Sequence, residues 1–135
     1  MTLVIDASVT LAWCLEDEQS DYAETIFSRL TGERATVPSL WAVEVANGLR
    51  NAERRDRLSP AGAAEAHGLL SRLPVEIEET SLYRVLVPVL NVARTNNLSA
   101  YDASYLELAM REGLALATVD DRLRAAAARV GVTLA

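Results

Sequence analysis

The chain has 135 residues, half of them hydrophobic, and its formal net charge is −6. This length predicts one domain over residues 1–135, and the hydrophobic fraction excludes a disordered chain. All thirteen basic residues are arginines, so lysine-dependent P-loop and Schiff-base chemistry are excluded. The single cysteine, Cys14, excludes an intramolecular disulfide and a thiolate metal cluster.

The first half of the chain predicts two buried strands, over residues 2–6 and 35–37, with Pro38 ending the second. Short polar residues precede the helical patterns, and we expect Ser8, Ser39 and Ser59 to act as helix caps. Pro60 suits the first position of a helix. The predicted helices cover residues 8–15, 21–30, 39–55 and 60–73.

The second half predicts strands over residues 75–78 and 116–119 and a short edge strand over 132–134. Helices are expected over residues 80–97, 102–111 and 121–129. The first should be kinked or split by Pro88, and Gly113 should end the second. The apolar stripe expected on the first helix consists of Leu82, Leu86, Val89, Leu90 and Ala93. Because strands alternate with helices, we predict an α/β fold with a parallel sheet covered on both faces.

Four carboxylates lie in apolar surroundings. Asp6 ends the first strand, Asp120 follows the fourth, Glu44 interrupts an apolar helix, and Asp102 opens another helix. Burial of such groups is costly unless positive charge compensates for it. Oxygen ligands from several elements suit Mg²⁺ or Mn²⁺. The pattern therefore predicts a metal site for phosphodiester chemistry.

The predicted topology supports the same location. Parallel sheets bind ligands beyond the carboxyl ends of their strands, where Asp6 and Asp120 are both expected. Two of the acids also have a simpler interpretation. Asp102 and Asp120, each considered alone, could serve only to cap a helix, which is a common role of aspartate.

Four motifs in order indicate a family. They are Val4–Ser8, Trp41–Asn47, Ser99–Ala103 and Leu116–Asp120. With these motifs the chain resembles PIN domains, and more closely the VapC-like toxin ribonucleases of bacterial toxin–antitoxin pairs. The resemblance implies a three-layer α/β/α sandwich with a short parallel sheet. It also implies a Mg²⁺- or Mn²⁺-dependent endoribonuclease that a cognate antitoxin restrains, and a homodimer or a toxin–antitoxin hetero-oligomer.

The resemblance also assigns residues. The family's acidic positions, which bind metal and carry catalysis, fall on Asp6, Glu44, Asp102 and Asp120. Its accessory hydroxyl falls on Thr118, with Ser8 as a second candidate. Asp121 is a second acid beside the family position, so the choice between Asp120 and Asp121 stays open, as does the choice between one metal ion and two.

Asn47 follows Glu44 by three residues and shares its helix face. We expect it either to orient Glu44 or a metal-bound water, or to make an ordinary surface hydrogen bond. Arg50, Arg54 and Arg55 belong to the densest basic cluster, and they are candidates for RNA phosphate contacts. The other interpretation is a solvated helix end whose arginines complement the helix dipole.

The early helices suggest a partner surface. Apolar side chains of residues 13–27 are expected beside the helix that carries Trp41 and Val45. They are Trp13, Leu15, Ile26 and Phe27. Either they leave a groove for an amphipathic antitoxin helix, or they fill the core.

No apolar run is long enough to cross a bilayer, and Asp6 interrupts any leader-like segment, so a cytoplasmic protein without membrane contact is expected. Two other functions were considered. An Asp-based phosphatase would want a second aspartate where Ser8 stands, and a receiver domain would want a lysine. A catalytically silent PIN-like module that binds RNA or protein is disfavoured because all four acids are present.

Overall fold

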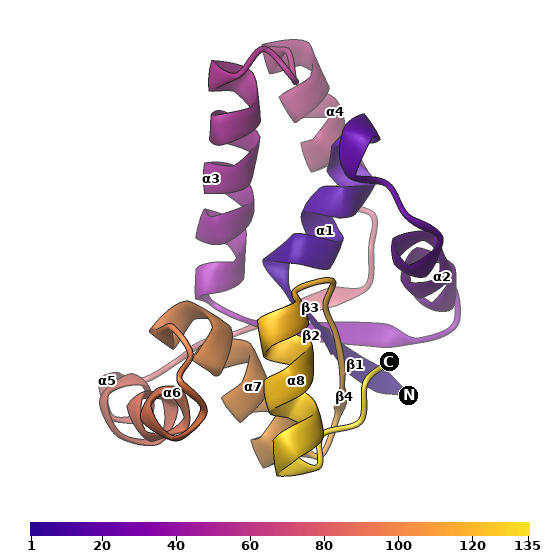
Figure 1. Ribbon diagram of the computed structural model, residues 1–135. Coiled ribbons are helices and arrows are strands. Elements are labelled where there is room, and N and C mark those ends of the chain that lie inside the picture. Colours follow the sequence, from indigo (N-terminus) through magenta and orange to yellow (C-terminus); the bar gives the residue numbers. More distant parts are fainter.

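The computed structural model describes residues 1–135 and contains one four-stranded sheet (Figure 1). All neighbouring strands are parallel, in the order β3-β2-β1-β4. The predicted edge strand over residues 132–134 is reduced to one bridge between Leu134 and Leu116. The four strands are β1 (Thr2–Ile5), β2 (Arg34–Pro38), β3 (Val75–Glu78) and β4 (Ala115–Ala117).

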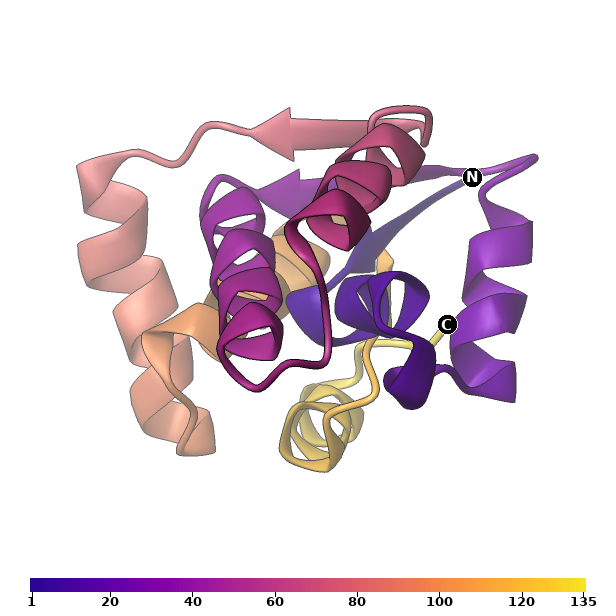
Figure 2. The ribbon, with the colours of Figure 1, turned by 90° about the horizontal axis from the view of Figure 1, so that it is seen from above.

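Helices connect the strands on both sides of the sheet. Figure 1 shows α1, α3 and α4 above the sheet and α5, α6 and α7 lower in the view, and Figure 2 shows the arrangement from above. Right-handed crossovers explain this division, because the path runs outward from β1 to β3 and then returns to β4. The helices of the first half are α1 (Ala7–Cys14), the 3₁₀ turn η1 (Glu16–Glu18), α2 (Asp21–Arg29), α3 (Leu40–Arg54) and α4 (Pro60–Leu70). Those of the second half are α5 (Leu82–Arg84), the π-helical turn η2 (Val85–Val89), α6 (Leu90–Asn96), α7 (Ala100–Glu112) and α8 (Asp121–Val130).

The core is built around β1 and α7. Every residue of α7 from Ala103 to Ala109 is buried, and the helix packs across β1, β2 and β4. Its one buried charge, Glu107, accepts hydrogen bonds from Arg84 and Arg111. Arg111 also binds Glu78 of β3, so paired charges tie this helix to the opposite edge of the sheet. Such pairing is what a buried carboxylate requires.

The structure corrects two of the expected caps. Asp6, not Ser8, is the N-cap of α1, and its carboxylate accepts a hydrogen bond from the amide of Val9. Ser39 does stand at the N-cap of α3, but its side chain makes no capping hydrogen bond. Ser59 caps α4 as predicted, by accepting from the amide of Gly62. Aspartate caps as effectively as serine, so residue preference alone does not separate Asp6 from Ser8.

Pro88 splits the helix that was predicted over residues 80–97. It lies in η2, where the missing amide hydrogen is accommodated by a π-helical turn between α5 and α6. The predicted apolar stripe is only half correct. Leu82 and Leu86 are 75% and 55% exposed, whereas Val89 is buried. The predicted ending of α7 at Gly113 is confirmed, since this residue adopts a left-handed conformation with φ of 65°. No helix of the fold is long and apolar enough to cross a membrane.

Candidate active site

A small cleft of about 250 Å³ opens at the carboxyl edge of the sheet, beside the ends of β1 and β4. These strands are neighbours, and the chain reaches β4 only after passing to the far edge of the sheet. The cleft therefore lies where parallel α/β sheets bind their ligands. All four predicted acids line it, together with six other residues. The lining residues are Asp6, Ala7, Ser8, Leu11, Glu44, Asn47, Gly48, Asp102, Tyr105 and Asp120.

Asp6 is the most firmly held of the four acids. It is 3% exposed, and both of its carboxylate oxygens accept hydrogen bonds. The Ser8 hydroxyl lies 2.7 and 2.9 Å from the two oxygens, and the amide of Val9 donates to Oδ1 at 3.0 Å. The Thr118 hydroxyl donates to Oδ2 at 2.5 Å. Donors from the first turn of α1 and from Thr118, directly after β4, therefore fix the orientation of this carboxylate.

Thr118 connects the two acids at the strand ends. It is fully buried, and its hydroxyl, while donating to Asp6, also accepts a hydrogen bond from the amide of Asp120 at 3.0 Å. Asp120 in turn caps α8, because its Oδ1 accepts from the amide of Leu123. The capping interpretation is therefore confirmed for Asp120, and the same residue also lines the cleft.

Glu44 reaches the cleft from α3 and is held by a residue that the motifs did not indicate. The hydroxyl of Tyr105 in α7 donates to Glu44 Oε1 at 2.5 Å. Tyr105 is 1% exposed, and burial, followed by the hydrogen bond and the charge of Glu44, raises its pKa. The phenol therefore stays protonated and acts as the donor, while the second oxygen of Glu44 accepts no hydrogen bond from the protein.

Asp102 is the least restrained acid. Its carboxylate accepts no hydrogen bond from the chain, although it is half-buried in the first turn of α7. It is not the cap of that helix, because Ser99 holds the N-cap position and its hydroxyl accepts from the amide of Asp102. The capping interpretation is therefore wrong for Asp102. One helical turn separates it from Tyr105, so α7 contributes one acid and the hydrogen-bond donor for another.

Burial and mutual repulsion raise the pKa values of three of the acids. Desolvation is the largest cause for Asp6, for Glu44 and for Asp102. Repulsion adds to it, since the charge of Asp120 raises the pKa of Asp6 and the charges of Asp120 and Asp6 raise that of Asp102. The ionised cluster is thus unfavourable by itself, and a bound cation would relieve both the repulsion and the lost hydration.

The donor set fits a hard divalent cation. The cleft offers carboxylate oxygens from four elements and a neutral asparagine, with no cysteine or histidine. Such all-oxygen surroundings suit Mg²⁺ or Mn²⁺. No three of the acidic side chains already meet closely enough to form a complete ligand set. The four acids therefore share one cleft, in which Asp6 is the most restrained carboxylate and Asp102 the least.

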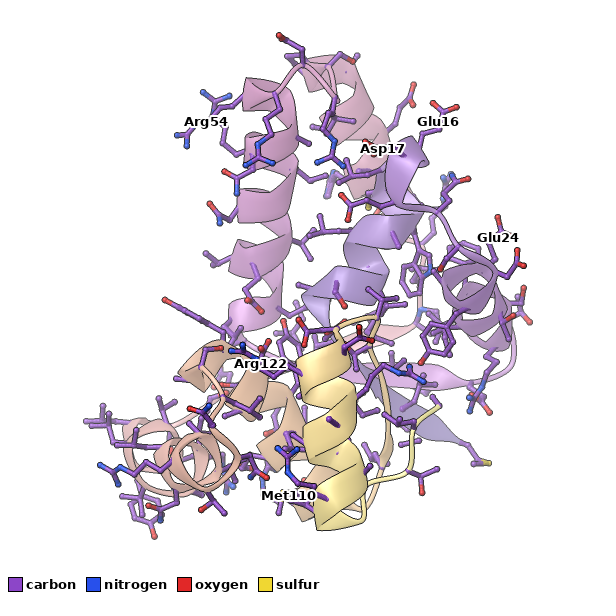
Figure 3. All side chains as sticks on the ribbon, viewed as in Figure 1. Glu16, Asp17, Glu24, Arg54, Met110 and Arg122 are labelled. Carbon is purple, nitrogen blue, oxygen red and sulfur yellow. The ribbon has the colours of Figure 1, made fainter.

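The remaining predicted residues divide into two groups. Asn47 lines the cleft beside Glu44 and is exposed, without a side-chain hydrogen bond. Asp121 is exposed and does not line the cleft, which favours Asp120 as the acid of this site. Arg54 extends from α3 into solvent (Figure 3), and Arg55 is likewise exposed and makes no ion pair.

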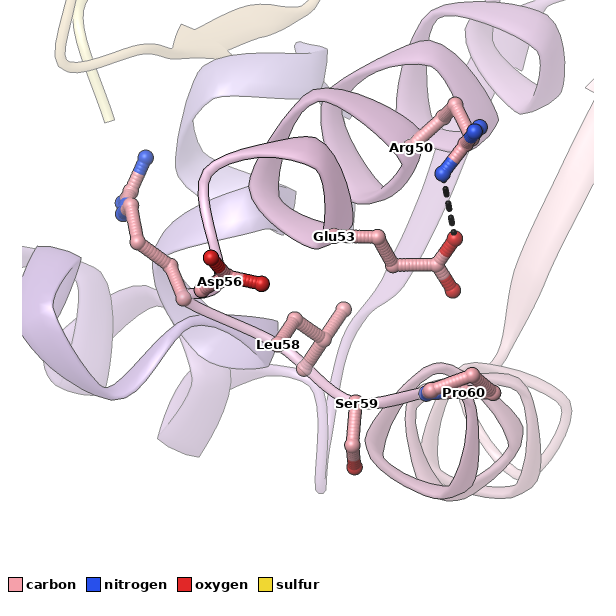
Figure 4. Close-up of a pocket in the computed structure, with 7 residues that line it drawn as sticks. Arg50, Glu53, Asp56, Leu58, Ser59 and Pro60 are labelled. Atoms are coloured by element: carbon pink, nitrogen blue, oxygen red, sulfur yellow. Dashed lines mark hydrogen bonds and ion pairs between the residues drawn. The ribbon is translucent and has the colours of Figure 1, made fainter.

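Arg50 and Arg57 are engaged elsewhere. A hollow of about 500 Å³ lies between the end of α3 and the start of α4, and it contains no part of the carboxylate cluster. Arg50 forms an ion pair there with Glu53 at 3.3 Å (Figure 4). Arg57 binds Asp17 and Glu18 of η1. This hollow carries charges of both signs, whereas the smaller cleft is lined by the four acids.

Three functional neighbours were not found from the sequence. Tyr105 and Gly48 line the cleft, and the charge of Arg122 lowers the pKa of Asp102 against the larger effect of burial. Figure 3 shows Arg122 at the start of α8, on the side toward α7. Gly48 allows α3 to approach α1, because a Cβ there would lie 2.4 Å from Leu11 Cδ1. Of these three residues, only Tyr105 could have been found from the sequence, because it follows Asp102 by three residues and so shares its helix face.

The expected partner surface is largely core. Leu15, Ile26, Trp41 and Val45 are buried, so those four residues do not line a groove. Trp13 and Phe27 remain partly exposed and pack edge to face, with ring centroids 5.4 Å apart. They line a surface hollow of about 160 Å³ between α1, α2 and α4.

Comparison with known proteins agrees with this architecture. The family model described as PIN domain matches residues 3–129. The chain is 38% identical over 122 residues to a VapC ribonuclease of Mycobacterium bovis and to ribonuclease VapC9 of Mycobacterium tuberculosis, covering 90% of this chain and 87% of each relative. It is 32% identical over 123 residues to ribonuclease VapC3 of Pyrobaculum aerophilum, covering 91% and 92%.

A solved structure shares the fold as well. The crystal structure of PAE2754 from Pyrobaculum aerophilum superimposes with a TM-score of 0.72 at 26% identity, covering 93% of this chain and 84% of the other. The region that the family model matches, residues 3–129, includes all four acids of the cleft and all of the strands except Thr2, the first residue of β1. The chain therefore belongs to the PIN domain family, as a VapC-like member of it.

Proposed function

We propose that this protein is a metal-dependent endoribonuclease that acts as the toxin of a toxin–antitoxin pair. One observation carries the proposal: four carboxylates from separate elements converge on a single cleft at the carboxyl edge of a parallel sheet. The names of the similar VapC ribonucleases support RNA as the substrate. Ionising the clustered acids is electrostatically costly, which is the expected property of a site built for cations.

Asp6, Glu44, Asp102 and Asp120 would hold the cation. When bound, Mg²⁺ or Mn²⁺ supplies a Lewis acid for the phosphate and lowers the pKa of a water molecule. The protein's part is to hold the ligands in place. Donors on both sides fix Asp6, the cap of α8 fixes Asp120, and Asp102 stays free to adjust. Four carboxylates carry enough charge for one ion or for two.

The substrate would follow α3 away from the cleft. The helical spacing places Asn47, Asn51 and Arg55 in one stripe that starts at Glu44, and Arg54 is adjacent to it. A ten-residue length of helix spans roughly 15 Å, so this stripe extends beyond a single nucleotide. Arg54 and Arg55 have no competing ion pair, whereas Arg50 is paired with Glu53. We therefore assign phosphate contacts first to Arg54 and Arg55.

Arg122 would contact the substrate close to the cut. It lies in the first turn of α8, its charge lowers the pKa of Asp102, and no carboxylate forms an ion pair with it. A phosphodiester approaching four carboxylates needs a local positive group, and a guanidinium suits a phosphate. Substituting Arg122 by glutamine should weaken RNA binding and reduce its salt dependence by about one charge.

The deciding experiment is cleavage of a mixed-sequence RNA by the purified chain with Mn²⁺ and with EDTA. We expect cleavage only with the metal, and none by Asp6→Asn, which keeps the shape of the side chain but removes charge from the site. Hydrolysis of an aryl phosphate without RNA cleavage would instead indicate an Asp-based phosphatase. Stoichiometric RNA binding without cleavage under all metal conditions would indicate a silent binding module.

The toxin role needs a separate test. The hollow lined by Trp13 and Phe27 is a small apolar surface for an antitoxin helix, and the acidic cleft is complementary to an arginine from the same partner. Expression of the chain alone should arrest growth, and co-expression with the neighbouring reading frame should rescue it. Light scattering of the purified chain and of the co-purified complex would then decide between a homodimer and a hetero-oligomer.

A further inference from the structure

The contact between Glu44 and Tyr105 is the most informative feature that the proposed reaction does not yet use. Tyr105 is buried in the central helix α7, and Glu44 is half-buried on α3, 61 residues earlier in the chain. Their 2.5 Å hydrogen bond is the one polar side-chain contact between these two helices. We propose that Tyr105 is a positioning residue, which holds Glu44 in the orientation that the cation site requires.

The packing of α3 explains why Glu44 needs such a restraint. This helix rises away from the sheet beside α1, and its contacts are mainly with α1 (Figure 1). On that side Trp41 donates to the Thr10 hydroxyl and Gly48 lies against Leu11. On the side of the cleft, no packed side chain of α3 confines Glu44. A glutamate has three rotatable side-chain bonds, so without a partner it would sample many orientations.

Tyr105 is well suited to removing this freedom. It sits in a fully buried stretch of α7, so its ring has little room to move. It lies one helical turn after Asp102, so one rigid helix sets the position of both an acid and the donor for a second acid. The donor occupies Oε1 of Glu44 and leaves Oε2 without a protein partner. Oε2 of Glu44 is thereby left available to a cation, while the hydrogen bond at Oε1 fixes the orientation of the carboxylate.

The same role is filled differently for the other fixed acids. Ser8 and Thr118 hold Asp6, and the backbone of α8 holds Asp120. Hydrogen-bond partners of metal ligands orient them, and removing such a partner typically weakens metal affinity or activity by about 10- to 100-fold. A tyrosine that merely satisfied its own buried hydroxyl would make no such difference. The inference rests on the proposed metal-dependent function. The test below distinguishes a failure of the positioning role from a failure of that function.

The test is Mn²⁺ titration calorimetry on the wild-type chain and on Tyr105→Phe, which removes one oxygen atom and preserves the ring. We expect the dissociation constant for Mn²⁺ to rise by about 10-fold. RNA cleavage at saturating metal should then retain the KM for RNA while kcat falls. Tyr83→Phe is the matched control, because Tyr83 is 68% exposed and its hydroxyl makes no hydrogen bond. Its Mn²⁺ affinity should equal that of the wild type.

A double-mutant cycle distinguishes positioning from a general loosening of the fold. In a Glu44→Gln background, adding Tyr105→Phe should cause no further loss of Mn²⁺ affinity, because its only route to the site has been removed. Additive losses, or an unchanged affinity in Tyr105→Phe, would overturn the inference while the proposed function stands. Absence of Mn²⁺ binding by the wild-type chain would overturn both. If Tyr105→Phe does not fold, Tyr105→Met removes the same donor and replaces it in the cycle.

Discussion

Thr118→Val offers the sharpest test of how the cleft is held together. The substitution exchanges a hydroxyl for a methyl group of similar size in a fully buried position. It removes the hydrogen bond to the carboxylate of Asp6 and the acceptor for the amide of Asp120. A hydrogen bond to a charged group contributes about 1.5–3 kcal/mol, and an amide left without a partner costs about 1 kcal/mol more. We therefore expect unfolding free energy to fall by about 3 kcal/mol, or Tm by on the order of 10 °C.

Urea denaturation in EDTA would measure this loss, with Thr118→Ser as the control. Serine keeps the hydroxyl and loses one methyl group, which costs about 1 kcal/mol. The effect should depend on pH. Thr118 lowers the pKa of Asp6 against the larger effect of burial, so its hydrogen bond favours the ionised carboxylate. The excess loss in Thr118→Val over Thr118→Ser should therefore be largest at high pH and should shrink as the pH falls through the raised pKa of Asp6. Equal losses in both variants at pH 7.5 would refute the reasoning.

Three further predictions concern charge, metal and close packing. Burial and the charges of Asp120 and Asp6 raise the pKa of Asp102, so its ionisation costs stability as the pH rises through that raised pKa. In EDTA at pH 7.5, Asp102→Asn should therefore melt above the wild type, with the difference vanishing below pH 4, and a lower melting temperature would contradict the crowding. Mn²⁺ should raise the melting temperature of the wild type. At a hundredfold excess over its dissociation constant, the free energy of unfolding should rise by about 2.7 kcal/mol. If calorimetry shows no shift of the melting temperature at millimolar Mn²⁺, the result would count against a metal site. Gly48→Ala should push Leu11 into the cleft and lower kcat/KM for RNA cleavage. Gly68→Ala is the control, because an added Cβ meets open space there. It should leave RNA cleavage unchanged and raise the unfolding free energy, measured by chemical denaturation, by up to about 1 kcal/mol.

The sequence by itself determined the sheet and the place of the site. Two apolar runs have the length expected of buried strands, and they end at Asp6 and just before Asp120. Because parallel strands place their carboxyl ends at one edge of the sheet, these two acids were expected near each other. The helix ends at Ser59 and Gly113 followed from local backbone chemistry. These features depend on residues that are close in sequence, which is why pattern and spacing were sufficient.

Tertiary structure decided which side chains meet. Tyr105 and Glu44 are separated by 61 residues, and Thr118 and Asp6 by 112, so only the placement of α3 and α7 around the cleft and the pairing of β4 with β1 bring them together. The same holds for the charges, because the path of the chain pairs Arg57 with Asp17, and the placement of α8 brings the charge of Arg122 within the influence of Asp102. Spacing along one helix specifies a shared face, but the partner of that face is set by the three-dimensional packing of the other elements.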